Sequence, residues 1–221
     1  MGLFLVEMEV EYEGKEYREF LKLCLEECEH AKERKEAGAT KHFFKKVGER
    51  KFYMVMDLPA EDIDTAMFTH PMMKQNGDKV RVNITPLIPY ETFASFVDKT
   101  LGKEDHEKPV TAPVERAGIF YWLKFDVEYP GKSQEDLFNV WSKEAAAAIG
   151  AKSKGIVVDL WKSVARRQVH ALLCVDSPDM LDDISLSLPI MQMMGDTVHI
   201  ECSSLRTHDS ILKCFKGKLD G

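Results

Sequence analysis

Two side chains have the chemistry and the expected position of a catalytic acid–base pair. An imidazole titrates near neutrality, at about pH 6.5 when unperturbed, so His42 could take a proton from one carbon and return it to another. Glu7 is the second candidate base, provided that burial raises the pKa of its carboxyl. Both residues are expected on strands, on the sheet face that no helix covers. We therefore predict that His42 and Glu7 are catalytic.

A second group of side chains is predicted to bind a substrate on the same kind of sheet face. Arg81 could hold a carboxylate through two hydrogen bonds, and Lys124 could attract one as a point charge. The alternative is that these charges only pair with one another, as Glu7 and Lys124 would. The predicted substrate-binding residues are Glu9, Arg81, Asn83, Lys124, Asp126, Asp159, Trp161, His199 and Glu201.

The candidate residues come from two copies of one sequence unit. The segment VEYEGK at 10–15 returns as VEYPGK at 127–132, 117 residues later. The segment PMM at 71–73 returns as PIM at 189–191, 118 residues later. A repeat of about a hundred residues is a whole small domain. We predict a first domain at 1–98, a linker at 99–116 and a second domain at 117–221.

Each copy has the hydrophobic periodicity of a β-α-β-β-α-β unit, the ferredoxin-like arrangement. Residues 4–11 alternate, so that Val6 and Met8 share one face of a strand and Glu7 and Glu9 share the other. Ser133 and Asp136 have the spacing of a capping box that would begin the first helix of the second copy. The predicted strands are 4–11, 40–47, 51–58 and 79–85 in the first copy, and 119–127, 156–164, 168–175 and 197–203 in the second.

The sheet of each predicted unit would have one bare face. Because both helices of a ferredoxin-like unit cover the same side, the other side is normally covered by an equivalent sheet. Two copies in one chain supply that partner. We predict an α+β fold in which two tandem ferredoxin-like units pack sheet to sheet as a pseudo-dimeric α+β barrel, with the candidate residues in a cavity between the sheets.

Parts of both copies resemble muconolactone isomerase. In the second copy the similar segments are LPI at 188–190, VHIE at 198–201 and LRTHDSI at 205–211. In the first copy they are GATKHFFK at 38–45, with a His four residues past a Gly, and DLP at 57–59. The resemblance implies units that assemble into oligomers and shift a proton within an unsaturated lactone without a cofactor. This chain differs in being a fused tandem and in carrying Asp159 where the first copy has His42.

The leading hypothesis is therefore a cofactor-independent isomerase or cyclase that moves a proton within a small unsaturated lactone or enol-type substrate. Two alternatives remain open. One is a non-catalytic barrel that binds a small ligand. The other is a monooxygenase of the same superfamily, using oxygen, or haem with an imidazole ligand such as His42 or His199. No metal site is predicted, because Glu27 and His30 lie on a highly charged helical stretch and are interpreted as part of a solvated face.

Composition excludes several other classes. A net charge of −7 and an isoelectric point near 5.6 argue against binding to nucleic acid, whose phosphates would be repelled. No apolar run approaches the roughly 20 residues needed to span a bilayer, and the N-terminus lacks the basic region of a signal peptide. Five cysteines without paired metal-ligand spacing are typical of a reduced protein. We expect a cytoplasmic protein with a small-molecule substrate, and we consider a homodimer.

Overall fold

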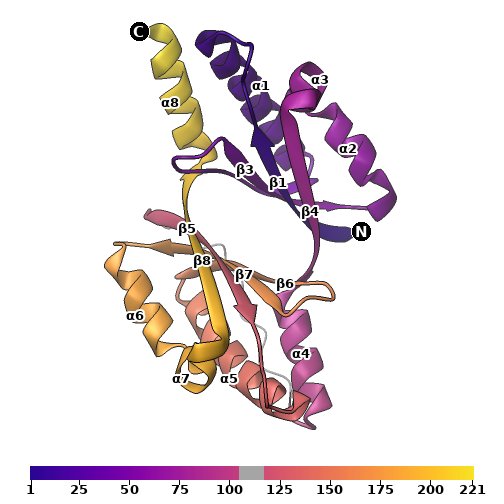
Figure 1. Ribbon diagram of the computed structural model, residues 1–221, viewed down its shortest axis with the longest axis vertical. Helices are drawn as coiled ribbons and strands as arrows, with labels where there is room; N and C mark the ends of the chain where they lie inside the picture. The colour runs from indigo at the N-terminus through magenta and orange to yellow at the C-terminus, as the bar shows by residue number, and fades with distance from the viewer. Residues whose placement is uncertain (105–116) are drawn as a thin grey trace. The chain divides into compact units, whose positions relative to one another are not determined.

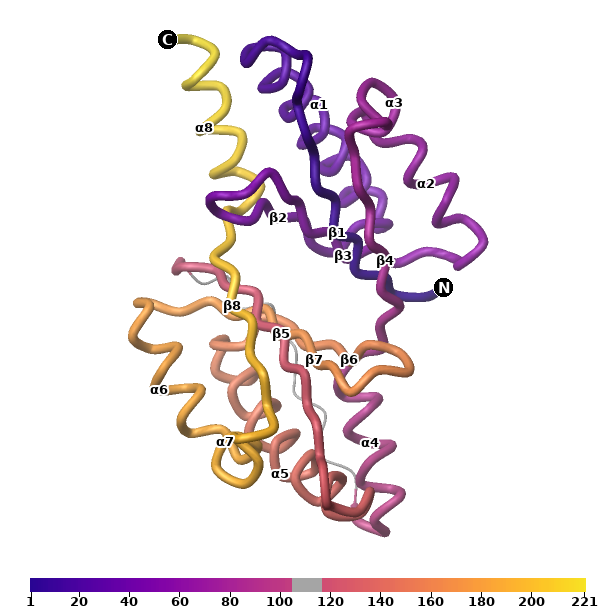
Figure 2. The backbone as a smooth tube through the Cα atoms, in the orientation of Figure 1, coloured from indigo at the N-terminus to yellow at the C-terminus, as the bar shows by residue number. Residues whose placement is uncertain are grey.

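The computed structural model describes residues 1–104 and 117–221, and its chain forms two compact units (Figures 1 and 2). Unit 1 consists of Met1–Leu87 and Leu205–Gly221, and unit 2 consists of Ile88–Ser204. Within the described residues, no helix is both long and apolar enough to cross a membrane.

The repeat predicted from the sequence is visible in the order of elements. The first copy contains β1 (Gly2–Val10), α1 (Tyr17–Glu36), β2 (Thr40–Lys46), β3 (Lys51–Leu58), η1 (Ala60–Asp62), α2 (Ile63–Thr69), α3 (Pro71–Asn76), η2 (Gly77–Lys79), β4 (Val80–Pro89) and α4 (Tyr90–Thr100). The second contains β5 (Ile119–Val127), α5 (Gln134–Ser153), β6 (Val157–Ser163), β7 (Gln168–Val175), α6 (Asp179–Ser187), α7 (Pro189–Met194), η3 (Gly195–Thr197), β8 (Val198–Thr207) and α8 (His208–Asp220).

The sheets have the strand pairing of ferredoxin-like units. In unit 1, β1 pairs antiparallel with both β3 and β4, and β3 pairs with β2. In unit 2, β7 pairs antiparallel with both β5 and β6. The predicted α+β class and the two tandem ferredoxin-like units are confirmed.

Each unit has its own hydrophobic core between its sheet and its helices. In unit 1, the core residues of β1 are Val6, Met8 and Val10, and they pack with Cys24 and Cys28 of α1. Burial raises the pKa of both thiols, that of Cys24 to about 12. In unit 2, alternate residues of β5 do the same beneath α5. The alternation of apolar residues therefore predicts correctly which faces of β1 and β5 pack against the helices.

The first long helix of the second copy begins at the predicted cap. The Ser133 hydroxyl accepts a hydrogen bond from the Asp136 backbone N–H at 3.1 Å, and the Asp136 carboxylate accepts one from the Ser133 N–H at 2.9 Å. The Ser133 hydroxyl, which donates to the Asp136 carboxylate at 2.7 Å, and the Ser133 backbone N–H together lower the pKa of Asp136. The reciprocal pair satisfies two backbone donors that would otherwise have no partner in the first turn.

A proline divides the second helical region of each copy into two short helices. Residues that precede proline avoid the helical conformation. His70, before Pro71, and Leu188, before Pro189, are accordingly extended, with φ/ψ of −65°/132° and −65°/131°. The break starts a new helix, α3 or α7, whose first backbone N–H groups have no partner within the helix. These donors become important at the candidate site.

The units do not follow the boundaries expected from the sequence. Helix α4, which ends the first copy, belongs to unit 2 and packs on α5. Helix α8, which ends the second copy, belongs to unit 1 and packs on α1. Residues 99–116 were predicted as a linker; α4 continues to Thr100, and residues 105–116 lie outside the described part of the chain.

Candidate functional site

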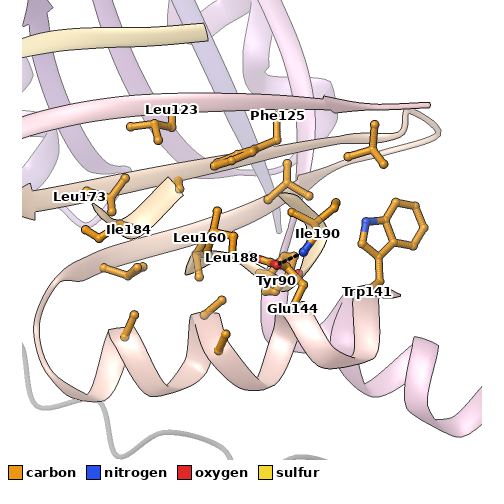
Figure 3. Close-up of a pocket in the computed structure, with 17 residues that line it drawn as sticks. Tyr90, Leu123, Phe125, Trp141, Glu144, Leu160, Leu173, Ile184, Leu188 and Ile190 are labelled. Carbon is orange, nitrogen blue, oxygen red and sulfur yellow. Dashed lines mark hydrogen bonds between the residues drawn. The ribbon is translucent and has the colours of Figure 1, made fainter. Parts of the chain in front are cut away.

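Unit 2 contains an apolar cavity between its sheet and its helices (Figure 3). Its volume is about 70 Å³. Strands β5, β6 and β7 form one wall, and α4, α5, α6 and the first turn of α7 form the other. Of the 17 lining residues, three carry a polar side-chain atom, namely Tyr90, Trp141 and Glu144. The others are aliphatic residues and one phenylalanine, so the cavity suits a small ligand that is mostly hydrocarbon.

Glu144 is the carboxyl group of this cavity. It lies on α5, and its Oε2 accepts a hydrogen bond from the backbone N–H of Ile190 at 2.9 Å. Burial raises the pKa of the carboxyl to about 6, although the Ile190 hydrogen bond opposes that shift. Because Ile190 is the second residue of α7, this N–H is one of the donors left free by the break before Pro189. The proline thus creates the hydrogen bond that orients the carboxyl.

The other two polar side chains have different surroundings. Tyr90 begins α4, and burial, with a smaller effect of the Glu144 charge, raises the pKa of its hydroxyl. Trp141 lies three residues before Glu144 on α5 and packs edge-on against Phe93, with ring centroids 4.9 Å apart. The cavity therefore combines one carboxyl that can exchange a proton near neutral pH with two groups that can donate hydrogen bonds.

The first copy uses the equivalent glutamate differently. Glu27 lies 117 residues before Glu144, and its Oε2 accepts a hydrogen bond from the Met72 backbone N–H at 3.1 Å. Its Oε1 lies 2.5 Å from Nδ1 of His70, and both side chains are 0% exposed. In the second copy the position of His70 is occupied by Leu188. The expectation that Glu27 belongs to a solvated face is wrong, because its carboxylate forms a buried pair.

Four of the predicted substrate-binding residues meet on the face of the unit 2 sheet that faces away from its helices. Lys124 forms ion pairs with Glu201 at 2.8 Å and with Asp126 at 3.8 Å. The indole of Trp161 stacks on that of Trp122, with centroids 5.2 Å apart. These contacts agree with the alternative considered above, in which charged side chains on the bare sheet face pair with one another. They leave the predicted substrate-binding role untested.

The same face carries a histidine to which the sequence assigned no role. The indole N–H of Trp122 donates to Nδ1 of His170 at 3.1 Å, so the proton of the neutral imidazole lies on Nε2. Nε2 lies 3.1 Å from both Ser163 Oγ and Gln168 Oε1. Burial lowers the pKa of His170 to about 4. Gln168 in turn donates to Asp126 at 2.8 Å, which links the histidine to the ion pairs of Lys124.

The predicted residues of unit 1 form a separate set. Asn83 donates to the Glu7 carboxylate at 2.7 Å, and Lys51 lies 3.6 Å from that of Glu9. The ring of His42 is nearly parallel to that of Phe44, with centroids 6.2 Å apart. Arg81 is exposed on β4.

The last two predicted residues are Asp159 and His199. The Asp159 carboxylate accepts from Lys152 of α5 at 3.1 Å, and Lys152 also binds Glu91 of α4 at 2.5 Å. In the sheet, Asp159 pairs with Leu172, which also pairs with Trp122, so Asp159 lies on the same face of the sheet as Trp122. His199 is exposed on β8.

Sequence reasoning missed Glu144 and Trp141, although a signal was present. The buried stripe of α5 contains Trp141, Ala145 and Ala148, and Glu144 lies within that stripe. A glutamate recurs at the matching position of both copies, on the apolar side of α1 and α5. A charged residue on a buried stripe needs a polar partner, which is the clue that the repeat offered.

The comparisons with known proteins agree with this architecture. Residues 119–210 match the family model described as muconolactone delta-isomerase. No curated protein matches the sequence at a significant level.

Two solved structures show the fold over nearly the whole chain. A mutant of chlorite dismutase from Candidatus Nitrospira defluvii superposes with a TM-score of 0.58 and 11% identity, covering 97% of this chain and 95% of that one. The same enzyme in complex with imidazole superposes with a TM-score of 0.55, at 11% identity and the same coverage. The second copy of the repeat therefore matches the muconolactone delta-isomerase family model, and the solved structures share the fold of the chain.

Proposed function

We propose that unit 2 is a cofactor-independent isomerase or cyclase that moves a proton within a small unsaturated lactone or enol-type substrate, with Glu144 as the acid–base group. The observation that carries the proposal is a carboxyl with a pKa of about 6 in an otherwise apolar cavity. A general base is most effective when its pKa lies near the working pH. Carboxyls tuned in this way by burial recur among catalytic acids and bases.

The reaction needs no other reactant. Ionised Glu144 would take a proton from the carbon beside the substrate carbonyl, breaking that C–H bond and leaving a dienolate. The neutral carboxylic acid would then return the proton to the far carbon of the conjugated system, so that the double bond moves and the carboxylate is restored. The hydrogen bond from the Ile190 N–H holds the carboxyl in one orientation during both steps.

The small volume of the cavity limits the size of the substrate, and part of the cavity wall must move to admit a lactone. A cavity of about 70 Å³ is roughly half of the 150 Å³ that holds benzene in an engineered protein. A five-membered lactone would therefore have to displace part of the wall. Helix α6 is the wall least held by packing, because none of its residues is buried. Its contribution to the cavity is Ile184.

The proposal is tested with α-angelica lactone, a neutral lactone whose double bond can move into conjugation. We expect NMR to show the conjugated isomer and Glu144→Gln to lower turnover by at least 10²-fold, because an amide cannot exchange the proton. The amide oxygen can still accept from the Ile190 N–H, so the fold should survive. Glu27→Gln, the matched change in unit 1, should leave the activity of correctly folded protein within about twofold.

Other outcomes would assign a different function. Wild-type turnover in Glu144→Gln, together with its loss in His42→Gln or Glu7→Gln, would move the reaction to the site predicted from the sequence. A lactone that binds saturably but is recovered unchanged by mass spectrometry would indicate a binding protein. A product heavier by one oxygen atom would indicate a monooxygenase.

A further inference from the structure

Trp141 has a buried donor without an acceptor. The residue is 5% exposed, and within residues 1–104 and 117–221 its Nε1–H has no hydrogen-bond partner. Leaving a buried donor unpaired costs about 1–3 kcal/mol, so such a group calls for an explanation. Trp122 shows the usual solution, since its own Nε1–H donates to His170 at 3.1 Å.

The position of this donor makes it relevant to the cavity. Trp141 and Glu144 are three residues apart on α5 and therefore share one face of the helix. Both line the cavity, and in Figure 3 the indole nitrogen lies on the side of the ring that faces Ile190, which binds the Glu144 carboxyl. A ligand in this cavity would meet the carboxyl and the indole N–H from the same helix.

We propose that the Trp141 Nε1–H binds the carbonyl oxygen of the substrate, and that the substrate is a neutral carbonyl compound. This inference rests on the proposed function and deepens it. When Glu144 removes a proton beside a carbonyl, negative charge develops on the carbonyl oxygen, and a preorganised N–H donor stabilises that charge. A carbonyl oxygen would also supply the acceptor that the indole lacks.

The charge of the cavity excludes anionic substrates. None of the 17 lining residues is a lysine, arginine or histidine, and the single ionisable acid of the cavity is itself negative above a pKa of about 6. A substrate carboxylate would lose its hydration without gaining a cation, which is strongly unfavourable. The site therefore selects a neutral ketone, ester or lactone rather than a lactone acid.

The test uses two ligands of nearly the same shape, cyclopentanone and methylenecyclopentane, which differ in having C=O or C=CH₂. The chain has three tryptophans, so protein labelled with ¹⁵N-tryptophan has three indole signals, and Trp141→Phe assigns one of them. We expect cyclopentanone to shift the Trp141 signal downfield in a saturable manner. The Trp122 signal serves as an internal control, since its donor is already bonded.

Methylenecyclopentane should bind about tenfold more weakly and leave the Trp141 signal without a downfield shift, as expected for the loss of one hydrogen bond. In Glu144→Gln, cyclopentanone should still shift the Trp141 signal. The binding role of Trp141 is therefore tested separately from turnover. It is overturned if cyclopentanone does not bind, if it binds without moving the Trp141 signal, or if both ligands bind equally well.

Discussion

At the scale of single residues, one position distinguishes Glu27 from its counterpart in the second copy, Glu144. Glu27 and Glu144 both accept a backbone N–H from a short helix that follows a proline break. Glu27 also contacts His70 at 2.5 Å, whereas the second copy has Leu188 at that place. A polar partner makes Glu27 part of a structural pair, and its absence leaves Glu144 available for chemistry.

Leu188→His should therefore give Glu144 an imidazole neighbour like the one that Glu27 has in His70. An imidazole beside Glu144 would stabilise the carboxylate and lower its pKa from about 6 toward the ordinary value of 4.5. The acidic limb of the pH–rate profile should move to lower pH, and turnover near neutrality should fall because the base is weaker. Leu188→Met is the size control and should leave the limb in place. An unchanged limb in Leu188→His would show that this position does not govern the carboxyl.

The reciprocal change should affect stability rather than activity. His70→Leu would leave the Glu27 carboxylate buried beside apolar groups, and removing one partner of a buried pair costs about 3–5 kcal/mol. Urea denaturation should show this loss, and the double variant His70→Leu/Glu27→Gln should recover part of it. If the single variant matches the wild type in stability, the pair at 2.5 Å contributes nothing.

At the scale of elements, the helix that ends each copy is packed in the unit formed mainly by the other copy. Ile211 and Phe215 of α8 belong to the core of unit 1, and Phe93 and Val97 of α4 belong to that of unit 2. Amphipathic periodicity locates such helices but does not say which apolar surface they cover. The prediction therefore assigned each of these helices to the copy that precedes it in the chain, which gave the expected boundaries at 98 and 117.

Ile211→Ala tests this assignment of α8. The side chain is fully buried, and truncation of such an isoleucine costs about 2–5 kcal/mol. Hydrogen exchange should show lost protection in α1 of unit 1, while the amides of α5 in unit 2 keep theirs. Phe93→Ala, at the matching position of α4, should give the reverse pattern. Loss of protection in α5 with Ile211→Ala would contradict the assignment.

At the scale of the whole molecule, the titration of Glu144 and that of His170 should make stability depend on pH in opposite directions. The folded pKa of Glu144, about 6, lies above the ordinary 4.5, so its contribution is present at low pH and is lost as pH rises through 6. The folded pKa of His170, about 4, lies below 6.5, so its contribution is present above pH 6.5 and is lost as pH falls through 4.

Difference profiles isolate these contributions. Between pH 4.5 and 6.5, the wild type should lose roughly 2 kcal/mol relative to Glu144→Gln, at 1.36 kcal/mol per pKa unit. Between pH 4 and 6.5 it should gain about 3 kcal/mol relative to His170→Gln by the same conversion. Urea denaturation across this range measures both slopes. Slopes of the same sign would refute the account of either Glu144 or His170.

Much of the fold was predictable from the sequence because it depends on periodicity. The alternation of Val6, Met8 and Val10, the cap at Ser133 and the repeat itself each reflect local rules. The candidate site depends on non-local features. Glu144 depends on the Ile190 N–H, which is brought to it only where two distant segments meet.

The most direct test is the titration of Glu144 itself. Carboxyl ¹³C NMR of labelled protein, assigned by the loss of one signal in Glu144→Gln, gives the pKa of this group without any substrate. The account predicts an inflection near pH 6. An inflection near the ordinary 4.5 would mean that the cavity does not tune its carboxyl, and the proposed proton transfer would lose its basis.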